Sequence, residues 1–303
     1  MRPFIIGIGE VLWDNLPSGP RLGGAPTNFA CHARALGADA RIVSRVGDDE
    51  SGALLLRKLE EAGMLVSGIS IDPVHPTGSV GVEIMEDGQP VFTIHENVAW
   101  EHLVADSATE DLFKQADAVC FGSLAQRNAV SGNVIRCLVG LTAPETLRIF
   151  DVNLRQNYFT AQTILSSLNL ANVLKLNDAE LPKLAEMLDL SGSVREQFEA
   201  LISRFHLRLI AYTRGSEGSV LFDGLEWCEH PGLTTQVCDT VGAGDSFTAT
   251  VVMGLLKGWP LEAISAAANE VAAHVCSCDG AVPPMPDRLS TMFQDESLAV
   301  GVG

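Results

Sequence analysis

Short apolar segments rich in Val and Ile alternate with longer segments of helical periodicity along most of this chain. Such runs suit strands that are buried on both faces, and the helical segments suit the crossovers that join parallel strands. We expect strands at Phe4–Ile8, Ile42–Val46, Ala118–Phe121, Leu147–Val152, Val173–Leu176 and Leu209–Thr213. We expect helices at Thr27–Leu36, Ser51–Ala62, Val130–Leu141, Ala179–Leu188 and Val194–Phe205. The pattern predicts an α/β fold with a doubly wound, mainly parallel sheet flanked by helices.

One segment departs from this alternation. Residues Ser79 to His95 alternate inward and outward positions around Asp87-Gly88, a pair that favours a tight hairpin turn. With residues 11–22, the segment 79–97 is predicted to form a small antiparallel β lid over a binding site. The alternative is an ordinary hairpin at a sheet edge. No long linker interrupts the chain, so residues 1–303 are predicted to form a single α/β domain that carries this lid.

The charge and cysteine content argue against several classes of partner. Asp and Glu outnumber Lys and Arg by 38 to 20, which leaves a net charge of −18 and disfavours binding to nucleic acid or to an anionic membrane. The seven cysteines are an odd number without metal-site spacing, as in reduced intracellular proteins. The most apolar stretch after the N-terminus, Phe247 to Leu256, is about half a membrane span. We therefore expect a cytoplasmic protein that binds small molecules.

The segment Asp239-Thr240-Val241-Gly242-Ala243-Gly244-Asp245 carries the strongest chemical signal. We expect it to follow a strand that ends near Val237 and to precede an apolar helix. Small residues let backbone amides approach a ligand, and a helix N-terminus directs its amides toward an anion. Asp245, directly after this anion site, is placed to accept a proton from a substrate hydroxyl during phosphoryl transfer. The alternative is an aspartate that only caps the helix.

Three spaced motifs resemble those of the PfkB, or ribokinase-like, carbohydrate kinases. The first is Gly23-Gly24-Ala25-Pro26-Thr27-Asn28, the second is Asn177-Asp178-Ala179-Glu180, and the third is the segment from Asp239 to Asp245. The resemblance extends from about Ile5 to Pro283. It implies a ribokinase-like fold, with ATP and Mg²⁺ as cofactors. Relatives often pair through their lids, which makes a homodimer through the lid compatible with the resemblance.

The resemblance also implies a role for each matched residue. For catalysis it implies Asp245 as the base, with the amides of Gly242, Ala243 and Gly244 as the anion hole. Asp14, Gly24 and Asn28 are implied to hold the sugar hydroxyls. Asn177, Thr213, Gly215, Gly218 and Asn269 are implied to bind the nucleotide. Glu180 is implied to organise Mg²⁺ through water, together with Asn177. Carbonyls near Asp239, Val241 and Gly280 are implied for a monovalent cation such as K⁺.

Each of these residues also has a purely structural interpretation. Asp14 and Asn28 suit turns or helix caps, and Asn177 with Glu180 suits a capping pair at a helix start. Gly215 and Gly218 suit a hairpin turn before Ser219. The functional interpretation depends on the three motifs occurring together and in order.

The distribution of basic residues bears on the substrate. No Lys or Arg occurs between Lys58 and Lys114, a span that includes most of the predicted lid. A sugar that carries a carboxylate or phosphate would need a cation nearby. The sequence therefore favours a neutral sugar, with Gln126 as a further hydroxyl contact and Arg155 leaning toward the transferred phosphates. The opening Gly9 to Asp14 and the run Phe150 to Arg155 look most like fructokinases, so fructose is the first expectation, with a sugar-acid kinase such as a 2-keto-3-deoxygluconate kinase as the alternative.

Two other classes of protein compete with a kinase. A nicotinamide-dependent oxidoreductase needs a third glycine and a helix after the first strand, whereas Gly9 here is followed by Trp13 and Pro17. A non-catalytic sugar or nucleotide sensor on the same fold would be expected to lose the base or the anion hole, and both are present in the sequence.

Overall fold

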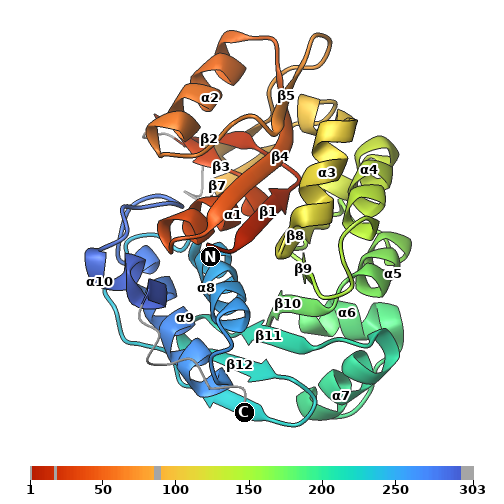
Figure 1. Cartoon of the computed structure of the whole chain (residues 1–303), viewed down its shortest axis with the longest axis vertical. Helices are drawn as coiled ribbons and strands as arrows, with labels where there is room; N and C mark the ends of the chain where they lie inside the picture. The colour runs from red at the N-terminus through yellow and green to blue at the C-terminus, as the bar shows by residue number, and fades with distance from the viewer. Residues whose placement is uncertain (1, 17–18, 85–89, 295–303) are drawn as a thin grey trace.

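The computed structural model describes residues 2–16, 19–84 and 90–294 (Figure 1). Its main feature is a nine-stranded sheet in the order β13-β12-β11-β10-β9-β8-β1-β4-β5. Strands β11, β10, β9, β8, β1, β4 and β5 pair in parallel. Strands β12 and β13 extend the sheet with antiparallel pairs. Their bounds are β1 Phe4–Ile8, β4 Asp39–Gly47, β5 Ile69–Asp72, β8 Ala118–Gly122, β9 Leu147–Asp151, β10 Val173–Asn177, β11 Leu209–Thr213, β12 Ser219–Phe222 and β13 Trp227–His230. The predicted fold class is confirmed.

Helices cover both faces of this sheet (Figure 1). One face is covered by α1 Ala25–Ala35, α2 Glu50–Glu61, α8 Ala243–Leu256 and α9 Leu261–Cys276. The other is covered by α3 Ser107–Gln115, α4 Ala129–Gly140, α5 Ala161–Leu170, α6 Leu181–Leu188 and α7 Val194–Phe205. A short helix, α10 Asp287–Ser290, follows α9. Neighbouring residues of β1 enter opposite cores: Ile5 packs on the α8 side and Ile6 on the α4 side. Burial on both faces explains why the parallel strands are apolar throughout.

Helix α8 lies inside the protein for most of its length. Residues Phe247 to Gly254 are buried without interruption, and the helix packs against α1 and α9. A helix that is apolar on all sides needs neighbours on all sides. Its first turn is therefore held in place by the core, which fixes the position of Asp245.

The strand predicted to end near Val237 is absent. Strand β13 ends at His230, and residues 231–237 have no regular structure. Pro231 has no N–H to donate to a ladder, and Gly232 has a φ of 83°, outside the range of a strand. The connection from β13 to α8 is therefore a long loop.

A second, four-stranded sheet lies against the main domain. Its order is β3-β2-β6-β7, formed by β2 Leu12–Leu16, β3 Gly19–Gly23, β6 Ser79–Ile84 and β7 Pro90–Ile94. The pairs β2/β3 and β6/β7 are antiparallel, and β2 joins β6 in parallel, with Trp13 opposite Ser79. The two segments predicted for the lid thus share one sheet. The Asp87-Gly88 turn lies outside the described residues.

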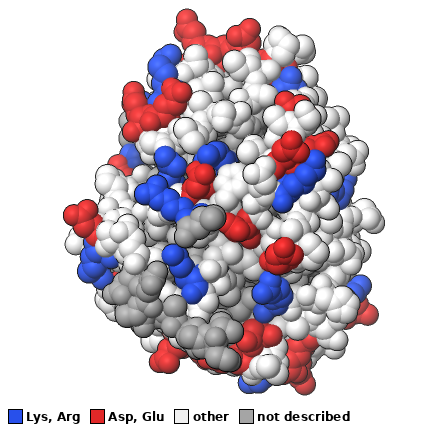
Figure 2. Space-filling model, viewed as in Figure 1, with Lys and Arg blue, Asp and Glu red and all other residues white. Residues whose placement is uncertain are grey.

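Two further observations concern the surface and the helices. Acidic and basic side chains are interspersed on the face shown in Figure 2. Among the helices that the structure describes, none is both long and apolar enough to cross a bilayer.

Candidate active site

The candidate active site lies where the direction of strand order reverses. From β1 the sheet continues to β4 and β5 on one side and to β8 through β11 on the other. In open α/β sheets, ligands bind at such a switch point, beyond the carboxyl ends of the strands. Residues that follow or end these strands, together with the first turns of α1 and α8, form the site.

Asp245 is half-buried in the first turn of α8. Its Oδ2 accepts a hydrogen bond of 2.8 Å from Nδ2 of Asn28, in the first turn of α1. Burial and the negative charge of Asp151 raise the pKa of Asp245 to about 6, while Lys175, the Asn28 bond and Arg155 oppose the rise. The carboxyl group is therefore a stronger base than an ordinary aspartate, yet ionised at neutral pH.

The loop before Asp245 requires its glycines. Gly242 has a φ of 80°, and a Cβ there would lie 2.1 Å from the carbonyl oxygen of Ala281. A Cβ on Gly244 would lie 3.1 Å from Nζ of Lys175. The amide of Ala243 makes only a long bond of 3.4 Å, to the Thr240 carbonyl. These amides belong to a helix N-terminus, where an anion is stabilised.

Asp14 and Gly24 approach the same region from the small sheet and from the start of α1. Burial raises the pKa of Asp14 to about 6, and Arg155 opposes the rise. A Cβ on Gly23 would lie 2.2 Å from Oδ2 of Asp14, so the carboxylate packs against this glycine. Gly24 has a φ of 107°, and a Cβ there would lie 2.3 Å from the carbonyl oxygen of Glu10.

Glu10 is a site residue that the sequence analysis missed. It follows β1, is 2% exposed, and accepts a bond of 3.2 Å at Oε1 from the amide of Ala25. Its Oε2 is buried without a partner in the described structure. Burial raises the pKa of Glu10 to about 7, Arg155 opposes the rise, and Asp245 adds to it. The available signal was an acidic residue directly after a buried apolar strand.

Lys175 and Asp151 were also missed as site residues. Nζ of Lys175 lies 3.0 Å and 3.1 Å from the two carboxylate oxygens of Asp151, and both side chains are buried. Asp151 is the last residue of β9, and Lys175, its partner in the sheet register, is the middle residue of β10. The signal was a lysine inside the apolar run Val173–Leu176, since a buried lysine needs a partner.

Asn177 and Glu180 are brought together beside the end of β11. Asn177 pairs with Thr213 in the sheet register. Its Oδ1 accepts a bond of 3.0 Å from the Glu180 amide, and Oε2 of Glu180 accepts one of 2.8 Å from the Asn177 amide. Oε1 of Glu180 accepts another, of 2.9 Å, from the amide of Leu154. Asn177 and Glu180 therefore do form a capping pair. The same bonds fix the buried Glu180 carboxylate at the edge of the site.

The residues predicted for the nucleotide surround one turn. Gly215 and Gly218 both have positive φ, and a Cβ on Gly218 would lie 2.0 Å from the carbonyl oxygen of His230. Asn269, on α9, donates a bond of 2.7 Å to Oγ of Ser219, directly after the turn. Helix α9 thus holds this turn in place.

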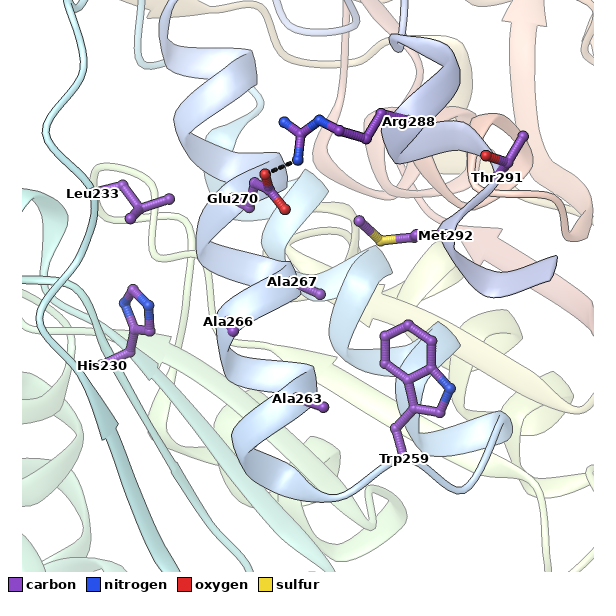
Figure 3. Close-up of a pocket in the computed structure, with 10 residues that line it drawn as sticks. All are labelled: His230, Leu233, Trp259, Ala263, Ala266, Ala267, Glu270, Arg288, Thr291 and Met292. Carbon is purple, nitrogen blue, oxygen red and sulfur yellow. Dashed lines mark hydrogen bonds and ion pairs between the residues drawn. The ribbon is translucent and has the colours of Figure 1, made fainter. Parts of the chain in front are cut away.

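A groove of about 730 Å³ adjoins the same turn through His230, which pairs with Ser219 (Figure 3). Figure 3 shows α9 along the groove, with Ala263, Ala266 and Ala267 on its wall. The remaining lining residues are His230, Leu233, Trp259, Glu270, Arg288, Thr291 and Met292. Most of the wall is apolar or small, which suits a flat organic ring.

The residues predicted for a monovalent cation also lie together. Oδ1 of Asp239 accepts a bond of 3.0 Å from the Val241 amide, and Oδ2 accepts one of 3.3 Å from the Gly280 amide. Arg21 of the small sheet forms an ion pair with the adjacent Asp279. The loop at Asp279 and Gly280 is therefore linked to the segment before α8 through Asp239 and to the small sheet through Arg21.

Gln126 and Arg155 are placed differently from each other. The Gln126 side chain is buried, donating bonds of 2.9 Å to the Gly122 carbonyl and to Oγ of Ser167. The structure shows no contact between Gln126 and the carboxylates described above. Arg155 is exposed, but its charge lowers the pKa of Glu10, Asp14 and Asp245. Arg155 therefore lies near these carboxylates.

Comparisons with known proteins bear on this arrangement. The sequence profile of pfkB family carbohydrate kinases matches residues 20–288. The chain is 28% identical to a putative sugar kinase of Pyrococcus horikoshii over 260 residues, 83% of this chain and 79% of that protein. It is also 28% identical to probable fructokinase-5 of Arabidopsis thaliana over 313 aligned positions, 94% of each chain.

Solved structures agree with the sequence comparisons. The Pyrococcus horikoshii sugar kinase aligns with a TM-score of 0.83 at 27% identity over 98% of this chain and all of that one, and its complex with ATP aligns with 0.81. A putative ribokinase II from E. coli aligns with 0.83 at 20% identity over 97% and 99% of the two chains, which confirms the ribokinase-like fold. From its matched profile and its fructokinase-like relatives, this chain belongs to the pfkB family of carbohydrate kinases, which are phosphotransferases that act on a sugar.

Proposed function

We propose that this protein transfers the γ-phosphoryl group of ATP to a hydroxyl of a small neutral sugar, with fructose as the first choice. The observation that carries the proposal is the position of Asp245. Its half-buried carboxylate directly follows the Gly242–Gly244 loop and is held by Asn28, a residue of the predicted sugar motif. Support for ATP comes from the ATP complex of the Pyrococcus horikoshii relative, and support for fructose from the plant fructokinases.

In the proposed reaction, Asp245 accepts the proton of the sugar hydroxyl. The hydroxyl oxygen attacks the γ-phosphorus, the bond from phosphorus to the bridging oxygen breaks, and ADP leaves. The amides of Gly242, Ala243 and Gly244 stabilise the charge on the phosphoryl oxygens, together with the N-terminus of α8. Arg155, on the exposed side, is placed to lean toward the same phosphates.

The proposed sugar contacts are Asp14, Gly24 and Asn28. They present mainly hydrogen-bond acceptors, which suit the hydroxyl donors of a neutral sugar. The carboxyl groups of Asp14, Asp245 and Glu10 are all largely buried in this region, so an anionic substrate would face their negative charge whenever they are ionised. This favours fructose over a sugar acid. We leave Gln126 out of the sugar contacts because its amide is already hydrogen-bonded inside the protein.

The residues near Glu180 fit a Mg²⁺ ion held through water. Each carboxylate oxygen of Glu180 accepts one backbone N–H, and a carboxylate oxygen can accept a further bond from a water. Glu180 with Asn177 would hold the hydrated ion, which neutralises charge on the phosphates when bound. Carbonyls near Asp239, Val241 and Gly280 fit a monovalent cation such as K⁺, because the Asp239 carboxylate already joins these two segments.

The nucleotide is proposed to lie along the turn formed by Thr213, Gly215 and Gly218. The adjoining groove beside Asn269 offers small and apolar residues for the adenine ring. This places the phosphates between the turn and the N-terminus of α8.

The four-stranded sheet is proposed to act as a lid on this one-domain enzyme. Closure would exclude water and favour transfer to the sugar over hydrolysis of ATP. Its link to the loop at Gly280, through Arg21 and Asp279, offers a route by which a bound cation and lid position influence each other. A homodimer through the lids is compatible with this arrangement.

A coupled assay of ADP release tests the proposal. The purified protein is assayed with Mg-ATP against fructose, ribose, 2-keto-3-deoxygluconate and nucleosides. We expect the highest kcat/KM with fructose or another neutral sugar. Preference for the sugar acid would support the alternative kinase, and ligand-induced thermal stabilisation without ADP release on any substrate would indicate a sensor.

A further inference from the structure

The buried ion pair between Lys175 and Asp151 lies directly beneath the proposed anion hole. Both side chains are less than a tenth exposed, and two of the three ammonium protons are accounted for by the two Asp151 oxygens. The Lys175 ammonium is also the first atom that a Cβ on Gly244 would meet, at 3.1 Å. A fixed positive charge therefore lies under the middle of the Gly242–Gly244 loop.

The same pair is close to the two functional carboxylates on either side. Asp151 raises the pKa of Asp245 and Lys175 lowers it, after the larger effect of burial. Burial also raises the pKa of Glu180, which Lys175 lowers and Asp151 raises. Burial lowers the pKa of Lys175, but Asp151, Glu180 and Asp245 outweigh it and keep the group charged. The Lys175–Asp151 pair thus interacts both with Asp245, the proposed base, and with Glu180, the carboxylate proposed to hold the metal.

We propose that Lys175 and Asp151 are positioning residues for phosphoryl transfer: their buried ion pair supports the Gly242–Gly244 anion hole from below and fixes the charges beside Asp245. The inference rests on the proposed function.

Stability alone is a weak explanation for this pair. A buried ion pair is costly to desolvate, and an apolar pair of similar size is often as stable. A general base works best when its pKa lies close to the working pH. A carboxylate and an ammonium together allow that pKa to be adjusted in either direction.

Other charged or titratable groups also face Asp245. They are Glu10 after β1, Cys120 on β8 and Arg155 after β9. Asn28 contributes its hydrogen bond from α1. Because all of these groups are unchanged in the variants below, a difference between variants reports the ion pair itself.

The test measures kcat/KM for the sugar against pH, at saturating Mg-ATP, in Asp151→Asn and Lys175→Gln. Removing the Asp151 charge should move the acidic limb of this pH profile, where kcat/KM falls because Asp245 is protonated, to lower pH by about one pH unit. Removing the Lys175 charge should move it to higher pH by about the same amount. The double variant should have a limb close to that of the wild type, whatever its absolute rate. Shifts in the same direction, or no shift in Asp151→Asn, would overturn the proposal.

A second ion pair, on β4 and β5, provides the controls. Asp72, which is buried, and Arg45, which is partly buried, form an ion pair of 3.3 Å, so Asp72→Asn and Arg45→Gln also remove charges from a shielded pair. They should lower thermal stability but leave the acidic limb in place.

The proposal remains testable without turnover. The pKa of Asp245 can be followed by carboxyl ¹³C NMR in protein labelled at aspartate, with its signal assigned by its loss in Asp245→Asn. The same opposite shifts are expected. If the wild type phosphorylated no sugar but these shifts occurred, the proposed function would fail while the electrostatic role stood. Normal activity with an unmoved Asp245 pKa in both variants would refute the electrostatic role alone.

Discussion

Asn28 donates a hydrogen bond of 2.8 Å from Nδ2 to Oδ2 of Asp245, across a separation of 217 residues. The bond joins the first turn of α1 to the first turn of α8. It brings together the motif predicted to bind the sugar and the motif predicted to carry the base. The other polar atom of the Asn28 side chain, Oδ1, is buried without a partner in the described structure. Asn28 can therefore orient the base through Nδ2 and accept a hydrogen bond from a substrate hydroxyl at Oδ1.

Asn28→Ala should weaken both functions. Loss of a hydrogen bond to a charged group costs about 1.5–3 kcal/mol, so we expect kcat/KM to fall by about tenfold or more. The bond lowers the pKa of Asp245, so its removal should raise that pKa and move the acidic limb to higher pH. Michaelis kinetics from pH 5 to 8 provide the measurement. Asn169→Ala, an exposed control that loses only a bond to the Leu165 carbonyl, should show neither change.

Gly242→Ala should distort the anion hole. The residue has a φ of 80°, and the new Cβ would lie 2.1 Å from a backbone oxygen. We expect turnover to fall by about a hundredfold and the free energy of unfolding to fall by about 1–3 kcal/mol. Gly258→Ala is the matched control, because Gly258 has a φ of 67° and no atom within 4 Å of its Cβ position. That variant should lose some stability from strain but keep its turnover; equal losses of turnover would contradict the account.

Glu10 should make folding less favourable as the pH rises. Its folded pKa is about 7 against an ordinary 4.5, so the folded state binds the proton more tightly than the unfolded state. Its favourable contribution is therefore complete below pH 4.5 and is lost as the pH rises through 7, at an eventual cost of about 3 kcal/mol. Glu10→Gln should gain stability relative to the wild type between pH 5 and pH 8, measured by denaturant unfolding. In Glu60→Gln, which alters an exposed acid, a similar gain would show that general charge repulsion is responsible instead.

The sequence predicted the frame better than the site. The run Phe4–Ile8 coincides with β1, and the runs Val173–Leu176 and Leu209–Thr213 coincide with β10 and β11 to within a residue, because the signal of a buried strand is local. The strand predicted to end near Val237 is wrong: β13 ends at His230, because Pro231 and Gly232 do not continue a strand. Helices α3, α5, α9 and α10 were not predicted.

Glu10, Lys175 and Asp151 illustrate a different difficulty. Their significance depends on which buried groups lie beside them, and those groups come from distant strands and helices. A lysine in an apolar run indicates that a partner exists, but only the register of β9 against β10 identifies Asp151. The motif from Asp239 to Asp245 predicts that Asp245 lies in the site, whereas packing determines how strong a base it is.

Asp245→Asn tests the central claim most directly. The variant keeps the shape and the Asn28 neighbour but cannot accept the sugar proton, so ADP release should fall by about a thousandfold. Thermal stabilisation by Mg-ATP and by the sugar should persist, and Asp111→Asn, an exposed control on α3, should retain full activity. Loss of turnover with ligand binding intact is the predicted result. Turnover within about threefold of the wild type would contradict the assignment of Asp245 as the catalytic base.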